Sequence, residues 1–220
     1  MATVGPKAIT TLSDVKAALL RSDAADELAE EVFTDGGNYD EEGVAGIQSA
    51  SDDIRNYLHR DLFAQKWTPL LAGKDWKKVK RTPDSSYGYE LRLHRIPDWP
   101  VLKVSEDVKI HNQRRIFAPN GGQSSITLWA GYRREGQSAS DLGVSGALST
   151  SEIPVYPGNA VQVCKRIAVF YAVQKVKGLI GVQSETQMMG EWSSEARTTE
   201  TDRNFVHNQL KTLHCHRSLG

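Results

Sequence analysis

The stretch that decides the fold runs from Ser149 to Leu179 and reads STSEIPVYPGNAVQVCKRIAVFYAVQKVKGL. It opens on capping residues and prolines, which are the usual signal for a helix start. Lys177 and Gly178 suit a helix C-terminus. Between these signals the apolar residues recur at spacings of three and four, as on one face of an α-helix: Val161, Cys164, Ile167, Ala168, Tyr171, Ala172 and Val176.

The predicted helix also carries apolar residues beyond this stripe. Val163, Val169, Phe170 and Val173 fall between the stripe positions, so more than half of the helix circumference is apolar. Such a helix must be covered on several sides, either by its own domain or by a neighbouring copy of the chain. We expect the residues of this core or self-assembly contact to include Val161, Ile167, Phe170 and Tyr171.

The first 60 residues predict three helices joined by short links. Thr10 or Thr11 is expected to cap the first, with Asp14 in its first turn. The second begins near Asp23 and stops at the breaker that starts at Thr34. The third has the clearest three-four periodicity of apolar residues and ends near residues 59–61. Its predicted buried face consists of Val44, Ile47, Ser51, Ile54 and Leu58.

Alternating apolar residues then predict a small, mostly antiparallel sheet between about residues 62 and 133. Val101 to Ile110 is expected to form one strand. Asn120-Gly121-Gly122 is a hairpin signal that would join a strand at Ile116 to a strand at Ile126. Residues 134–149 are rich in glycine and serine and are expected to form a loop.

The sequence therefore predicts an α+β fold. A helical bundle is built from the N-terminal helices and the long helix of the C-terminal half, and a β-rich segment is inserted between them. In residue ranges, 1–61 and 149–220 form the helical part with a C-terminal tail, whereas 62–148 form the insertion and its loop. A short helix from about Asp202 closes the chain, with Phe205, Val206, Leu210 and Leu213 as its apolar residues.

The formal net charge is zero, but it is unevenly distributed. Residues 1–60 hold 5 Lys/Arg and 12 Asp/Glu, whereas residues 61–220 hold 22 and 15. A chain polarised in this way can stack on copies of itself or lie between partners of different charge, or it can have two differently solvated faces. Because no signal peptide or membrane span is predicted, and Cys164 and Cys215 have no disulfide spacing, we expect a soluble protein from a reducing compartment.

No motif indicates a reaction, and neither a cofactor nor a metal is expected. The histidines and cysteine near the C-terminus lack metal-ligand spacing: His207, His214, Cys215 and His216. The acidic residues around Asp35 and Asp40 lack the spacing of a calcium loop. A basic run surrounds Trp76 and can track a phosphate backbone or keep a hairpin tip soluble: Lys74, Lys77, Lys78, Lys80 and Arg81.

Four short sequence segments occur in a fixed order along the chain. The first is Tyr57-Leu58-His59-Arg60, at a predicted helix end, and the second is Leu91-Arg92-Leu93-His94-Arg95-Ile96-Pro97-Asp98-Trp99-Pro100-Val101-Leu102-Lys103-Val104. The third is Ile153-Pro154, before the long helix, and the fourth runs from Ser184-Glu185 through Gly190-Glu191-Trp192-Ser193. In this order they resemble the head–tail adaptor (connector) family of long-tailed bacteriophages. The resemblance spans nearly the whole chain.

The resemblance implies a structural, non-enzymatic virion protein, made in the host cytoplasm and located at the head–tail interface. It implies a ring, usually of 12 copies, that joins the portal protein to the next neck protein (a stopper or tail terminator) and extends the channel for the genomic DNA. In the family the C-terminal segment docks on the portal, which assigns that role here to Phe205, Leu210, Leu213 and Arg217. The basic run at 74–81 is then expected to face the lumen or the neighbouring ring.

Two alternatives remain at this stage. The chain could be a nucleic-acid-binding module that uses the basic residues 74–81, in which case its affinity for DNA falls steeply with salt. It could also be a metal-dependent enzyme that uses the histidines and cysteine of the tail, in which case metal is bound stoichiometrically.

Overall fold

The computed structural model describes residues 4–19, 40–59, 61–68, 70, 76–80, 87–91, 100–105, 108–111, 115–118, 125–184 and 204–213. The chain divides into two compact units. The helical unit consists of Met1–Leu58 and Pro157–Arg217, and the β-rich unit consists mainly of His59–Tyr156. Helices together with two antiparallel sheets make the fold α+β, as the sequence predicts.

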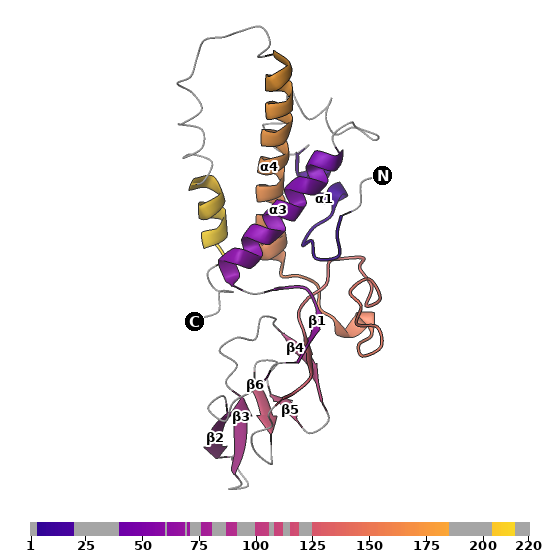
Figure 1. Cartoon of the computed structure of the whole chain (residues 1–220), viewed down its shortest axis with the longest axis vertical. Helices are drawn as coiled ribbons and strands as arrows, with labels where there is room; N and C mark the ends of the chain where they lie inside the picture. The colour runs from indigo at the N-terminus through magenta and orange to yellow at the C-terminus, as the bar shows by residue number, and fades with distance from the viewer. Residues whose placement is uncertain are drawn as a thin grey trace. The chain divides into compact units, whose positions relative to one another are not determined.

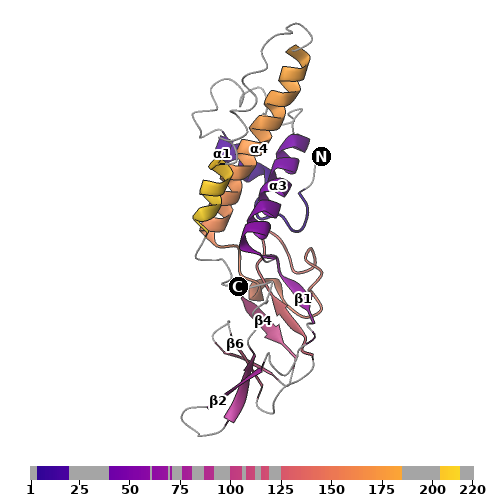
Figure 2. The same ribbon diagram turned by 60° about the vertical axis from the view of Figure 1, so that its left-hand side comes forward.

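The helical unit contains α1 (Leu12–Leu19), α3 (Asp40–Leu58), α4 (Gly158–Ser184) and a helix at residues 204–211 (Figure 1). Both views show the 204–211 helix, in yellow, beside the first half of α4 (Figure 2). The ring centroids of Phe170 on α4 and Phe205 on that helix lie 5.0 Å apart. The second helix predicted from Asp23 lies outside the described residues.

The N-terminus of α1 confirms Thr11 as its cap. The backbone N–H of Asp14 donates to Thr11 Oγ1 at 3.1 Å, and Thr11 Oγ1 donates to Asp14 Oδ2 at 2.9 Å. This exchange satisfies an N–H group that the first turn of a helix leaves without an intrahelical partner. The position of Asp14 on α1 is thereby fixed.

The antiparallel pair of α3 and α4 forms the core of the helical unit. A buried hydroxyl joins three segments, because Ser51 Oγ donates to the Ile47 carbonyl at 2.8 Å, accepts the Ile9 N–H at 3.2 Å and lies 3.6 Å from Cys164 Sγ. Most of the apolar residues buried in the two helices were predicted: Ile47, Ile54, Leu58, Val163, Cys164, Ile167, Ala168 and Ala172. Ala50 and Ala160 are buried as well but were not predicted, whereas the predicted Val44 is half-buried.

The predicted bounds of the long helix are wrong at both ends. Ser149 caps a short 3₁₀ turn at Thr150–Glu152, and α4 begins only at Gly158. The reason is that Pro154 and Pro157 each disfavour helical geometry in the residue before them. At the other end α4 continues through Gly178 to Ser184, because an interior glycine costs a helix only about 1 kcal/mol and does not by itself end it.

The β-rich unit contains a three-stranded sheet in the order β1-β7-β4 and a four-stranded sheet in the order β2-β3-β6-β5. All pairings within these sheets are antiparallel. The strands are β1 (Gln65–Trp67), β2 (Trp76–Lys80), β3 (Tyr87–Leu91), β4 (Val101–Val104), β5 (Lys109–His111), β6 (Arg115–Ala118) and β7 (Leu128–Ala130).

Two predictions for this unit are wrong. The stretch from Val101 to Ile110 forms two strands, β4 and β5, which belong to different sheets. The predicted hairpin at Asn120 would pair β6 with β7, whereas β6 pairs with β3 and β5, and β7 pairs with β1 and β4. Alternation predicts that a strand exists and which face is buried, but it contains no information on the pairing partner.

The predicted loop at 134–149 is confirmed as irregular, yet it contributes to the core of the β-rich unit. Ala139, Val144 and Leu148 are buried together with Ala64 and Ile153. Turns anchor the loop, including hydrogen bonds from the Val144 N–H to the Ala139 carbonyl at 3.0 Å and from the Leu148 N–H to the Val144 carbonyl at 2.9 Å.

Candidate functional site

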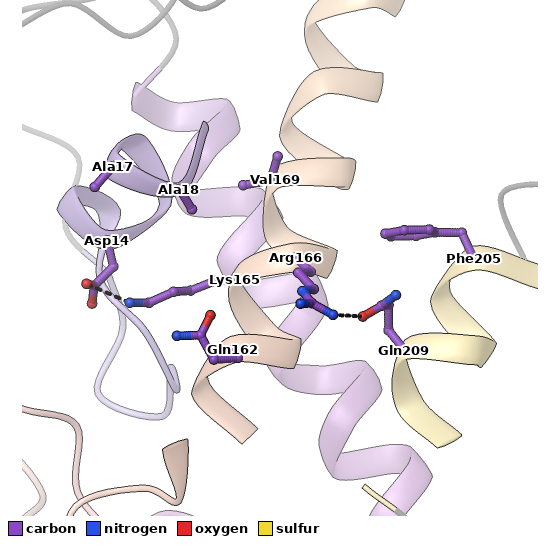
Figure 3. Close-up of a pocket in the computed structure, with 9 residues that line it drawn as sticks. All are labelled: Asp14, Ala17, Ala18, Gln162, Lys165, Arg166, Val169, Phe205 and Gln209. Atoms are coloured by element: carbon purple, nitrogen blue, oxygen red, sulfur yellow. Dashed lines mark hydrogen bonds and ion pairs between the residues drawn. The ribbon is translucent and has the colours of Figure 1, made fainter. Parts of the chain in front are cut away.

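An open groove lies in the helical unit between α1, α4 and the 204–211 helix (Figure 3). Its volume is about 730 Å³, within the range typical of ligand pockets. Apolar side chains form part of the wall, and charged or amide side chains form the rest. The lining residues are Asp14, Ala17, Ala18, Gln162, Lys165, Arg166, Val169, Phe205 and Gln209.

An ion pair joins α1 and α4 on one side of the groove. Lys165 Nζ lies 2.9 Å from Asp14 Oδ1. Burial raises the pKa of Asp14, but hydrogen bonds from Lys165 and Thr11 lower it by more, so the net pKa lies below its ordinary value. The carboxylate is therefore ionised at neutral pH and holds the lysine ammonium toward α1.

The other side of the groove is formed by α4 and the 204–211 helix. Arg166 Nη1 donates a hydrogen bond to Gln209 Oε1 at 3.3 Å. Figure 3 shows Lys165 and Arg166 extending toward different helices, Lys165 to α1 and Arg166 to the 204–211 helix. Two consecutive cations of α4 thus tie both neighbouring helices to it.

The lining of the groove suits a ligand that has an apolar body and an anionic group. Val169 and Phe205 provide apolar surface, and both are only half-buried. The Arg166 side chain is exposed and makes one hydrogen bond to a neutral amide, so its guanidinium keeps donors for an anion. A peptide side chain or terminus is one group of this chemistry.

The predicted docking residues of the C-terminal segment pack within their own unit. Leu213 is fully buried and Leu210 nearly so, while Phe205 is half-buried against Phe170. Arg217 lies outside the described residues. The apolar face of the 204–211 helix is therefore occupied by intramolecular packing in this structure.

The predicted core or self-assembly residues of α4 have different environments. Ile167 is fully buried, whereas Val161, Phe170 and Tyr171 are half-buried. The Tyr171 hydroxyl donates a hydrogen bond to Asp53 Oδ2 on α3. Burial raises the pKa of Tyr171, and the hydrogen bond to the Asp53 carboxylate raises it further.

The predicted basic loop is a strand over the part that the structure describes. Lys77, Lys78 and Lys80 belong to β2, which pairs along its whole length with β3. Lys77 and Lys78 are exposed. Lys74 and Arg81 lie outside the described residues. The hydrogen bonds to β3 fix the backbone of β2, so the positions of these lysines along the strand are fixed as well.

The residues considered for a metal site do not come together where they are described. His207 is exposed on the 204–211 helix, and Asp40 pairs with Lys16 at 2.6 Å. His214, Cys215, His216 and Asp35 lie outside the described residues. Within the described part of the chain, no group of three or more His, Cys, Asp or Glu side chains is placed to hold a metal ion.

Cys164 is a free, buried thiol, whose pKa is raised to about 12 by burial.

Sequence reasoning missed the groove. Its polar residues come from α1, α4 and the 204–211 helix, and no local spacing connects them. One signal was present, namely the two consecutive cations Lys165 and Arg166 on a helix that is otherwise largely apolar.

Across the described parts of the chain, no helix is both long and apolar enough to span a bilayer. Comparison with known proteins gives no relative: no protein-family model, no curated protein and no solved structure matches this sequence.

Proposed function

We propose that the protein is a structural adaptor of a bacteriophage neck, which assembles as a ring on the portal and extends the channel for the DNA. The observation that carries this proposal is the construction of the helical unit. Segments from both ends of the chain pack around α4, and a β-rich segment is inserted between them. Tyr57-Leu58-His59 lies where α3 ends, and Ile153-Pro154 precedes α4 in the sequence, so two of the adaptor-like segments fall at the boundaries of the inserted β-rich segment.

The length of α4 supports contact with other copies. α4 has 27 residues and α3 has 19, which correspond to about 40 and 28 Å of helix. The two helices run antiparallel, with Gly46 packed near Ala168 and Ala172, so the last turns of α4 extend past the start of α3 (Figure 1). In a helical bundle that forms a ring, this end of α4 can pack against the neighbouring copy.

The uneven charge distribution also supports a ring. Residues 1–60 are acidic on balance and residues 61–220 are basic on balance. In a heterologous contact, different surfaces of two identical copies meet, so an acidic surface of one copy can face a basic surface of the next. Such a contact closes into a ring when the rotation between copies permits it.

The mass of the protein in solution, alone and with the portal protein of the same phage, tests the proposal. A ring, or a monomer that becomes a ring on the portal, is the expected result. A monomer that remains monomeric and does not bind the portal would overturn it. The portal is used as an assembled ring, so that its symmetry is available to the adaptor.

The docking role of the C-terminal segment has its own test. We expect Arg217→Glu to weaken binding to the portal, since a charge reversal disfavours the docked state. Lys211→Glu is the matched control, because Lys211 is exposed on the 204–211 helix and has no docking role in the proposal. Equal loss of binding in both variants would show a general effect of charge. Retention of binding by both would remove the role of Arg217.

A further inference from the structure

The four-stranded sheet of the β-rich unit has two unlike faces. Leu91 on β3 pairs with Ile116 on β6, and both are buried in a cluster shared with Leu128 of the three-stranded sheet. Because side chains alternate along a strand, the residues next to Leu91 and Ile116 belong to the opposite face. These neighbours are Glu90 and Phe117, which are themselves paired.

A single row of paired residues crosses this opposite face. Lys77 on β2 pairs with Glu90 on β3, Glu90 pairs with Phe117 on β6, and Phe117 pairs with Lys109 on β5. Lys77 and Lys109 are exposed, and Glu90 and Phe117 are half-buried. The row therefore has an exposed cation at each edge of the sheet and less exposed side chains in its centre. We call it the Lys77–Lys109 row.

The neighbouring positions are compatible with close approach of a large anionic molecule. Gly88 is two residues from Glu90 on the same strand and carries no side chain. Within the Lys77–Lys109 row, Glu90 carries the one negative charge.

The geometry points to this face as a binding surface for the phosphate backbone of double-stranded DNA. Lys77 and Lys109 are separated by three strand spacings, or about 14 Å between their backbones. This separation is close to the width of the B-DNA major groove, about 12 Å, so the two ammonium groups can reach phosphates on both sides of one groove. Contacts of this kind carry no sequence information.

The register separates the contribution of Lys77 from that of Lys78. The two lysines are consecutive and both exposed, but they belong to opposite faces of β2. Lys78 pairs with Tyr89 and shares the face of the buried Leu91. If DNA binds to the Lys77–Lys109 row, its affinity depends on Lys77 and not on Lys78. If the lysines of β2 only keep an edge strand from aggregating, replacing Lys77 or Lys78 has the same effect.

The experiment measures binding of a short DNA duplex of mixed sequence by fluorescence anisotropy, between about 50 and 200 mM salt. We expect the wild-type chain to bind, with an affinity that falls as salt rises. In the double variant Lys77→Glu/Lys109→Glu, the slope of log K against log salt should drop by about 1.8, since each lost phosphate contact removes about 0.9. The affinity at low salt should fall by at least about tenfold.

Lys78→Glu is the matched control, because it makes the same change in charge on the same strand but on the other face. It should bind as wild type within about twofold, and Lys77→Glu alone should lose about half of the slope change of the double variant. Equal loss in Lys77→Glu and Lys78→Glu would overturn the proposal. So would absence of wild-type binding at low salt, or equal affinity for a polyglutamate chain of matched charge.

A third variant tests the row through a gain of affinity. Glu90→Gln removes the one negative charge of the row and should strengthen DNA binding about threefold or more, which misfolding cannot explain. No change or a loss would contradict a role for this face. The test uses the free chain and does not require a ring, so it can succeed when the portal experiment fails, and the reverse also holds.

Discussion

A Cβ atom added to Gly46 would lie 2.8 Å from the carbonyl oxygen of Ala168 on the facing helix. It would also lie 3.2 Å from the backbone nitrogen of Ala172. Both are backbone atoms of α4, and they cannot move aside as the end of a flexible side chain can. The missing side chain at Gly46 therefore sets how closely α3 and α4 approach each other.

Gly46→Ala is expected to lower the free energy of unfolding by about 1 kcal/mol, because overpacking costs about 1–3 kcal/mol and the higher helix propensity of alanine offsets about 1 kcal/mol. Urea denaturation followed by circular dichroism measures the change. Gly158→Ala is the control, since a Cβ there meets nothing within 4 Å. A similar loss in both variants would show that the close approach at Gly46 is not the cause.

Tyr171→Phe removes the hydroxyl that donates to Asp53 and is expected to cost about 1–2 kcal/mol of stability. The folded state raises the pKa of Tyr171 above its ordinary value of 10.0, so above about pH 10 the unfolded chain loses this proton more readily than the folded chain. The wild-type protein should therefore lose stability as the pH rises above 10, and Tyr171→Phe should lose less. Unfolding measured at neutral and alkaline pH would contradict this if both proteins declined in parallel.

Cys164 should be inert toward thiol reagents in the folded protein. Its pKa is raised to about 12, against an ordinary value of 9.0, so the reactive thiolate is depleted about a thousandfold near neutral pH. The measurement is the rate of alkylation in a Cys215→Ser chain, in which Cys164 is the one remaining cysteine. We expect modification at least about a hundredfold slower than in urea. Equal rates under the two conditions would show that the thiol is accessible.

Asp14→Asn should lower the stability of the helical unit by up to about 1 kcal/mol, because the pair with Lys165 is partly exposed. The folded state lowers the pKa of Asp14 below its ordinary value of 3.8, so its contribution is present above that pH and is lost as the pH falls through the folded-state pKa. Acid titration of stability should therefore be shallower in the variant. Asp141→Asn is a control outside the groove. The dependence of its stability on acid pH should also change, but Lys165 has no part in that change.

The helices were the more predictable part of the fold. The three-four rhythm of α3 identifies Ile47, Ile54 and Leu58 as core residues, and all three are buried. The capping exchange between Thr11 and Asp14 is also local in sequence. The bounds of α4 were less predictable, since a proline cluster at Pro154 and a glycine at Gly178 give signals whose effect depends on the backbone conformation that the chain adopts there.

The pairing of the strands could not be predicted, and the Lys77–Lys109 row depends on it. Lys77 and Lys109 belong to one row only because β3 and β6 lie between their strands in register. The groove has a similar origin, since Asp14, Lys165 and Gln209 come from three distant segments. Charge can be read from the sequence, but the neighbours of a charge are set by tertiary packing.

The discontinuity of the helical unit has a consequence for how the protein is made. Ser51 and Cys164, which meet in its core, are separated by 113 positions. During synthesis at about 5–20 residues per second, the chain from His59 to Tyr156 leaves the ribosome before α4 does, so the β-rich unit can fold while the apolar face of α3 still lacks its partner. We therefore expect Ile47, Ile54 and Leu58, which are buried in the folded protein, to stay exposed on the nascent chain for several seconds, and a chaperone would act in that interval.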